Sequence, residues 1–154
     1  MAIRTIITEE DPLLHKVCRP VEHFDERLAT LLDDMRETMI DADGVGLAAP
    51  QIGILRRVAV IDVGEGLVEL INPEIVYREG EQEMQEGCLS CPGTYGMTKR
   101  PAKVRVHAQD RFGKPFTLEA EGLFAVACCH EIDHLDGILF REHVVRMLSN
   151  GEEA

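Results

Sequence analysis

The H-E-x-x-H motif at residues 130–134 and the uncharged run before it constrain the fold more than any other part of the chain. Residues 123–129 carry no charge, so a helix through them would be apolar nearly all round and would lie in the core. Two histidines and two carboxylates at the end of such a helix are costly to bury unless they are paired or ligated. The pattern therefore predicts a buried helix from about Gly122 to Asp136, with Gly137 as its C-terminal stop.

The spacing of the motif predicts a metal site and a hydrolase. His130 and His134 are four positions apart, so on a helix they point the same way and can share one ion. Glu131 is rotated by about 100° from His130, which keeps its carboxylate out of the coordination shell but within reach of a bound water. That placement suits a general base that later donates the proton, while the metal lowers the pKa of water towards ~7.

Two histidines leave a tetrahedral catalytic site one protein ligand short if water is to take the fourth position. The metzincin spacing is absent, although His143, Glu142 and Glu152 lie downstream of the motif. A thiolate from upstream is therefore favoured as the third ligand. The five cysteines are an odd number without a secretory signal, which predicts reduced thiols instead of a disulfide framework.

Length predicts one domain, and the lack of an apolar run at the N-terminus or long enough to span a membrane predicts a cytoplasmic location. The 154 residues are enough for one ordinary core, with 149–154 expected to form a flexible tail. A net charge of −12 argues against direct nucleic-acid recognition, since phosphate contacts need clustered Lys and Arg. No segment reaches the roughly 20 apolar residues that a membrane span requires, so no membrane contact is expected.

The remaining patterns predict an α+β fold in which antiparallel or mixed sheets pack around the helix that carries the motif. Leu and Met recur at helical spacing over Glu26–Ala42, which predicts an amphipathic helix capped by Asp25 and ended by Gly44. The other expected elements are strands at Arg57–Val63, Leu67–Ile71 and Glu74–Arg78, a hairpin of Val104–Ala108 with Phe116–Ala120, and a last helix at Glu142–Leu148.

Three motifs, taken together, resemble those of type 1 peptide deformylases. They are GVGLAAPQ at residues 44–51, EGCLS at 86–90 and HEIDH at 130–134, and the likeness spans nearly the whole chain. Cys129 and Cys91 depart from the family, which usually has Gln and Val at these positions. Neither residue belongs to the expected chemistry.

The resemblance implies removal of the formyl group from the N-terminal formyl-methionine of new polypeptides, releasing formate. It assigns Cys88, His130 and His134 to one divalent metal, with Fe²⁺ favoured and Zn²⁺, Ni²⁺ or Co²⁺ compatible with the same ligands. Metal-activated water would attack the formyl carbon with Glu131 as general base and acid. The oxyanion would be stabilised by the Gln51 amide and the Leu89 backbone N–H. Ribosome contact is expected to be transient at most, because the C-terminus is short and acidic.

The substrate is expected to bind to residues near these motifs. Gly44 and Gly46 would let a peptide backbone approach and pair as an added strand, while Val126 and Ala127, one turn before His130, would line a pocket for the methionine side chain. The full expected set is Gly44, Val45, Gly46, Gly87, Arg100, Val126 and Ala127, with Arg100 placed near the peptide by the resemblance. Glu86 is either a solvated carboxylate or a partner that orients a ligand.

Two other functions fit parts of the pattern. A zinc endopeptidase would cleave internal peptide bonds with the same motif. Alternatively, Cys88, Cys91 and the two histidines could close a structural metal site that has no open position.

Overall fold

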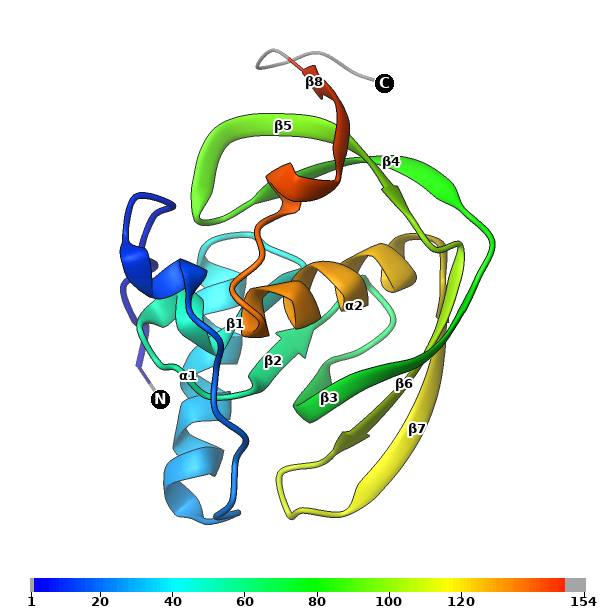
Figure 1. The fold of residues 1–154 in the computed structure, drawn as a ribbon. Helices are drawn as coiled ribbons and strands as arrows, with labels where there is room; N and C mark the ends of the chain where they lie inside the picture. The colour runs from blue at the N-terminus through cyan, green and yellow to red at the C-terminus, as the bar shows by residue number, and fades with distance from the viewer. Residues whose placement is uncertain (1, 149–154) are drawn as a thin grey trace.

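Two antiparallel sheets lie on either side of a central helix in the computed structural model, which describes residues 2–148 (Figure 1). The first sheet has the order β1-β2-β3-β6-β7 and comprises Gly46–Ala48, Val58–Ile61, Val68–Glu79, Lys103–Gln109 and Pro115–Glu121. The second has the order β4-β5-β8 and comprises Gln82–Cys88, Cys91–Arg100 and Val144–Leu148. The central helix α2, Gly122–Leu135, contacts strands of both sheets. The predicted α+β fold around the motif helix is confirmed.

The amphipathic helix predicted near the N-terminus is present as α1, Glu26–Asp41. Asp25 caps it, because its carboxylate accepts a hydrogen bond from the backbone N–H of Leu28 at 3.2 Å. The apolar face of α1 packs against β1, β2 and the single turn η2, Ala49–Ile52, and its buried residues there are Leu28, Leu32, Met35 and Met39. The packing of α1 therefore fixes β1 and the turn η2 that follows it.

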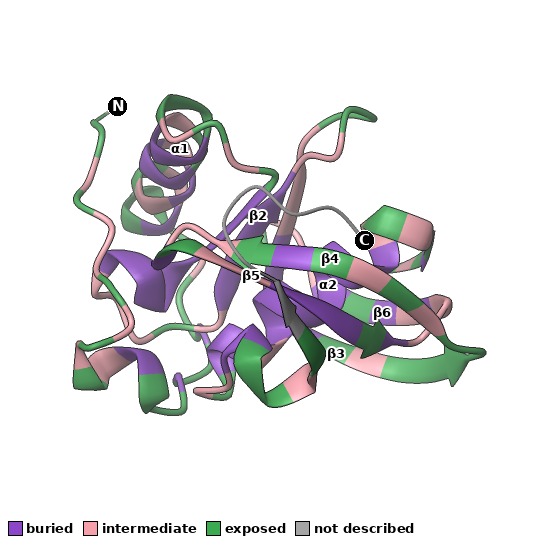
Figure 2. Ribbon diagram, turned by 90° about the horizontal axis from the view of Figure 1, so that it is seen from above, coloured by how far each residue is buried: buried purple, intermediate pink, exposed green. Residues whose placement is uncertain are grey.

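The four residues of β2 are fully buried because helices cover both faces of the sheet at this point (Figure 2). Side chains alternate along a strand. Val58 and Val60 pack in the cluster with α1, whereas Ile61 packs in the cluster with α2. The sheet therefore separates the two helices, and α2 lies between it and the strands β4 and β5.

Helix α2 ends where the sequence predicts. Gly137 has a φ of 77° and its N–H donates to the carbonyl of His134 at 3.1 Å. A Cβ at this position would lie 2.7 Å from the carbonyl carbon of His15, the last residue of the turn η1, Pro12–His15. Glycine is therefore required for both its conformation and the close approach of the N-terminal segment.

Two sequence predictions of secondary structure differ from the structure, and some strands were not predicted. The helix expected at Glu142–Leu148 is wrong: a short 3-10 turn η3, Phe140–His143, leads into β8, which pairs with β5. The strands expected at 67–71 and 74–78 form one strand, β3, with a bulge after Ile71 where Asn72 has a φ of 52°. Strands β4 and β5 were not predicted at all.

Among residues 2–148, no helix is long and apolar enough to span a membrane. The tail expected at 149–154 lies outside the described residues.

Candidate active site

Three side chains with metal-binding atoms converge where the end of β4 meets α2. The ligand atoms of Cys88, His130 and His134 all lie within 4.8 Å of one another. The sulfur of Cys88 is 3.3 Å from Nε2 of His134, and the two imidazole rings are 4.9 Å apart between centroids. The structure thus brings together the three residues that the resemblance assigned to the metal.

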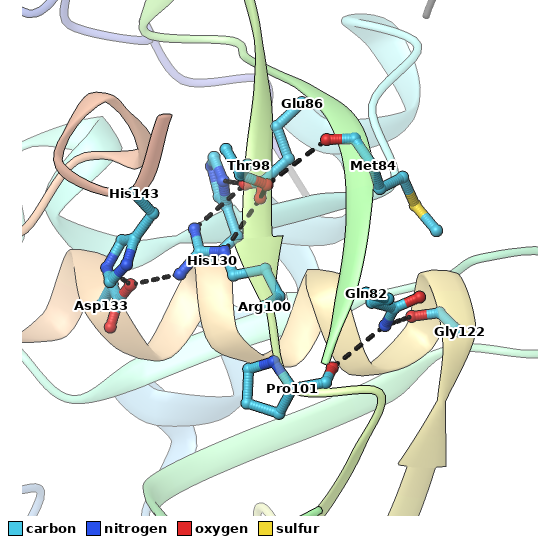
Figure 3. Close-up of polar contacts among 10 residues, drawn as sticks. All are labelled: Gln82, Met84, Glu86, Thr98, Arg100, Pro101, Gly122, His130, Asp133 and His143. Atoms are coloured by element: carbon cyan, nitrogen blue, oxygen red, sulfur yellow. Dashed lines mark hydrogen bonds and ion pairs between the residues drawn. The ribbon is translucent and has the colours of Figure 1, made fainter. Parts of the chain in front are cut away.

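A buried carboxylate fixes the ring of His130. Nδ1 of His130 donates to Glu86 at 2.8 Å, which leaves Nε2 as the free ring nitrogen (Figure 3). Glu86 also accepts hydrogen bonds from Arg100 at 2.8 and 3.1 Å and from the hydroxyl of Thr98. Burial alone would raise the pKa of Glu86, but these bonds outweigh it and hold the pKa at about 2. Of the two roles left open for Glu86, the structure favours the partner that orients a ligand.

Arg100 does not reach the cavity in which the substrate was expected to contact it. It is 3% exposed and does not line the cavity described below. Besides Glu86 from β4, its guanidinium contacts Asp133 on α2 at 2.7 Å. Two carboxylates from different elements hold it beneath the site, where it ties the three-stranded sheet to the helix. The direct substrate contact expected of Arg100 is therefore corrected to a structural one.

Removing this guanidinium should destabilise the fold. We expect Arg100→Ala to lower the free energy of unfolding by about 3–5 kcal/mol, because it leaves the Glu86 charge buried without its cation. Arg105→Ala is the matched control, since its pair with Glu119 is exposed and should contribute less than about 1 kcal/mol. Urea unfolding of both variants measures the difference. Equal losses would contradict the role given to Arg100.

Glu131 is buried but only partly satisfied. It is 4% exposed, and within the described chain Oε1 has no hydrogen-bond partner. Burial is the largest of the causes that raise its pKa to about 7. A carboxyl group in a cavity is suited to accept and return a proton when its pKa lies near neutral pH.

The amide of Gln51 is held in one orientation. Its Oε1 accepts from the backbone N–H of Ala48 at 2.9 Å, so its NH₂ group faces the cavity. That NH₂ group donates to the hydroxyl of Ser90 at 3.1 Å and lies 3.5 Å from the sulfur of Cys88. A donor that is fixed before reaction is what stabilisation of a developing oxyanion requires.

These groups open into one cavity of about 460 Å³. Its lining includes the predicted residues Gly44, Val45, Gly46, Gln51, Gly87, Cys88, Leu89, Val126, Ala127, His130 and Glu131. The lining residues that sequence reasoning missed include Cys91, Pro92, Gly93, Tyr95 and Leu123. Leu123 lies one helical turn before Val126 and Ala127, so the helical period that placed those two could have found it. The others depend on the pairing of β4 with β5.

The proposed four-ligand structural site is not assembled. In the described part of the chain, the group of clustered donors contains Cys88 and the two histidines but not Cys91. The sulfur of Cys91 instead donates to the carboxylate of Glu9 at 3.2 Å.

The clustered donors fit a divalent transition metal, because one sulfur and two imidazoles are ligands for zinc, iron, cobalt or nickel. Burial is the largest cause that lowers the pKa of His134, which keeps this ring neutral, as a metal ligand must be. Burial opposes protonation of His130 too, but Glu131 and Glu86 raise its pKa, and such a carboxylate partner strengthens a ring as a ligand. Open to a cavity beside a buried glutamate, this set is the arrangement of a metallohydrolase active site.

Comparisons with known proteins give the family. The sequence model of the polypeptide deformylase family matches residues 3–150. The peptide deformylase of Caldicellulosiruptor bescii is 59% identical over 152 residues, which cover 99% of this chain and 92% of the relative. That of Acetivibrio thermocellus is 60% identical, covering 99% and 89%. The crystal structure of peptide deformylase from Thermotoga maritima has a TM-score of 0.92 at 41% identity, covering 94% and 99%.

The chain belongs to the polypeptide deformylase family. It is therefore a hydrolase of a metalloenzyme family that removes the N-formyl group from nascent peptides.

Proposed function

We propose that the protein deformylates N-formylmethionyl peptides with one divalent metal ion held by Cys88, His130 and His134. The observation that carries this proposal is the convergence of these three donors at a cavity that Cys88, His130 and Glu131 line. We infer that residues 1–154 act as one catalytic domain in the cytoplasm, where new chains are made. Fe²⁺ is the ion favoured by the sequence resemblance, and Zn²⁺, Ni²⁺ and Co²⁺ suit the same ligands.

The roles of the protein groups follow from their positions. A divalent ion bound at this site supplies an activated water and polarises the formyl carbonyl. Glu131 takes the proton from the attacking water and passes it to the departing amine. The Gln51 amide and the Leu89 N–H donate to the oxyanion as the carbonyl becomes tetrahedral. Formate and a free amino terminus are the products.

Main-chain pairing supports binding of peptides that differ in sequence after methionine. In the described chain β1 lies at the end of its sheet and pairs with β2 alone, so its other edge can accept an added strand. Gly44, Val45 and Gly46 line the cavity along this segment. Across the cavity, Val126 and Ala127 provide an apolar wall for the methionine side chain.

Formate release tests the proposal directly. The protein, loaded with metal under anaerobic conditions, is given a formyl-Met tripeptide and the matching acetyl-Met tripeptide. We expect formate from the first peptide and little turnover of the second. Cleavage of an internal bond without formate would favour the endopeptidase and contradict the proposal.

Gly46 should be required for the placement of Glu131. A Cβ at Gly46 would lie 2.5 Å from Oε2 of Glu131, so Gly46→Ala must displace this carboxylate. We expect a loss of kcat/KM of about 10²-fold, the size typical of a misplaced catalytic group. In the control Gly44→Ala, the new methyl meets the movable end of the Leu89 side chain at 2.7 Å, and the loss should be much smaller. Wild-type activity in Gly46→Ala would show that this contact is unimportant.

A further inference from the structure

Two cysteines face each other across the turn that connects β4 and β5. Cys88 ends β4, Cys91 begins β5, and the two are paired residues in the register of the sheet, separated by Leu89 and Ser90. Directly opposed residues of an antiparallel pair have Cα atoms about 4.5–5.5 Å apart. A disulfide requires a Cα separation of about 4.4–6.8 Å. The backbone of this turn is therefore already suited to a disulfide.

Both thiols are also free and open to the same cavity. Neither is in a disulfide, and both line the cavity, so a small oxidant that enters it meets both. Glu9, which accepts a hydrogen bond from Arg141 at 2.8 Å, also accepts one from the thiol of Cys91 at 3.2 Å and keeps this residue at the turn.

The other three cysteines have a different environment. Cys128 and Cys129 belong to α2 and pack in an apolar cluster against the five-stranded sheet. Cys18 packs in another apolar cluster, with Leu135. None of the three lines the cavity. All three are buried, so a solute in the cavity does not meet them.

We propose that Cys88 and Cys91 are a redox modification site, at which hydrogen peroxide converts the two thiols into a reversible disulfide. The effect of this disulfide on metal binding rests on the proposed function. The sulfur of Cys88 cannot ligate a metal as a thiolate while it is bonded to Cys91. Oxidation therefore switches the enzyme off by removing one of the three ligands. Reduction by a dithiol restores the ligand.

The chemistry balances with peroxide as the only oxidant. The sulfur of one cysteine attacks peroxide, the O–O bond breaks, and a sulfenic acid and one water form. The other sulfur attacks this sulfenic sulfur, the S–S bond forms, and the S–O bond breaks to release a second water. Two thiols lose two electrons, and one peroxide gains them. Cys91 thereby spares Cys88 from further oxidation to the sulfinic acid, which thiols do not reverse.

The test uses the zinc-loaded full-length protein, treated with a small excess of hydrogen peroxide. The readouts are intact mass, thiol count after unfolding, peptide mapping, and zinc release measured with a chromogenic chelator. We expect the loss of two of the five thiols, a mass lower by two hydrogen atoms, a Cys88–Cys91 linked peptide, and loss of zinc. Dithiothreitol with added zinc should restore the thiols and the bound metal.

Variants separate this site from general oxidation. In Cys91→Val, peroxide should oxidise Cys88 past the sulfenic acid to the sulfinic acid, a gain of two oxygen atoms, so dithiothreitol should restore less bound zinc than in the unsubstituted protein. The control Cys128→Ser should still form the linked peptide. The inference is overturned by oxygen addition without a disulfide in the unsubstituted protein, by a disulfide elsewhere, by a disulfide that leaves zinc bound, or by full recovery of Cys91→Val. The mass and thiol readouts need no turnover, so failure of the proposed function would leave them interpretable.

Discussion

Glu131→Gln should retain the metal and lose turnover by about 10²–10⁴-fold, the range attributed to a general acid and base. The amide has the same shape as the carboxylate but cannot take a proton from water. Glu131 lies beside His130 in the sequence yet is not among the clustered donors, so the metal ligands are unaffected by the change. The loss should therefore fall on kcat much more than on metal content.

The measurement combines formate release with metal analysis of the same preparation. Asp136→Asn is the matched control, because this residue ends the same helix and its carboxylate is paired with Arg57 outside the cavity. It should keep its activity. If Glu131→Gln keeps most of the turnover with metal bound, proton transfer belongs to another group.

Cys88→Ala should lose the metal itself. Removal of a partner behind a ligand costs about 10–100-fold in metal affinity, and we expect loss of the ligand to cost at least the upper end of this range. Formate release would fall with it, and added metal would recover only part of the activity.

Cys91→Ala is the control that separates this prediction from the structural four-ligand site. Its sulfur donates to Glu9 and is not one of the clustered donors, so the variant should bind metal as tightly as the unsubstituted protein. Equal affinity in Cys88→Ala and the unsubstituted protein would place the third ligand elsewhere. Equal loss in both cysteine variants would support two sulfur ligands.

Local spacing was enough to predict the two helices and the two histidines. The rows of Leu and Met in α1 and the i, i+4 pair His130 and His134 are properties of short segments, and the structure contains both as expected. Cys88 lies 42 positions before His130, so residue spacing could not single it out from the other cysteines. The resemblance to deformylases chose it, and the structure places it beside the histidines.

The features that were missed depend on tertiary contacts. Residues 144–148 form a strand because β5 offers them an edge, which the sequence of this segment does not reveal. Strand β4 is rich in Gln and Glu, residues that are uncommon in strands, and it is held by its pairing with β5. From the sequence alone, an isolated arginine such as Arg100 is expected on the surface. The structure buries it because Glu86 and Asp133, from two other elements, accept its hydrogen bonds.

The number of sulfur atoms bound to the metal tests the central claim most directly. X-ray absorption of the zinc-loaded, reduced protein gives the identity and distance of the ligands. We predict one sulfur at about 2.3 Å and imidazole nitrogens at about 2.0–2.1 Å, with the remaining position taken by an oxygen of solvent. A spectrum with two sulfurs, or with none, would contradict a catalytic site built from Cys88, His130 and His134.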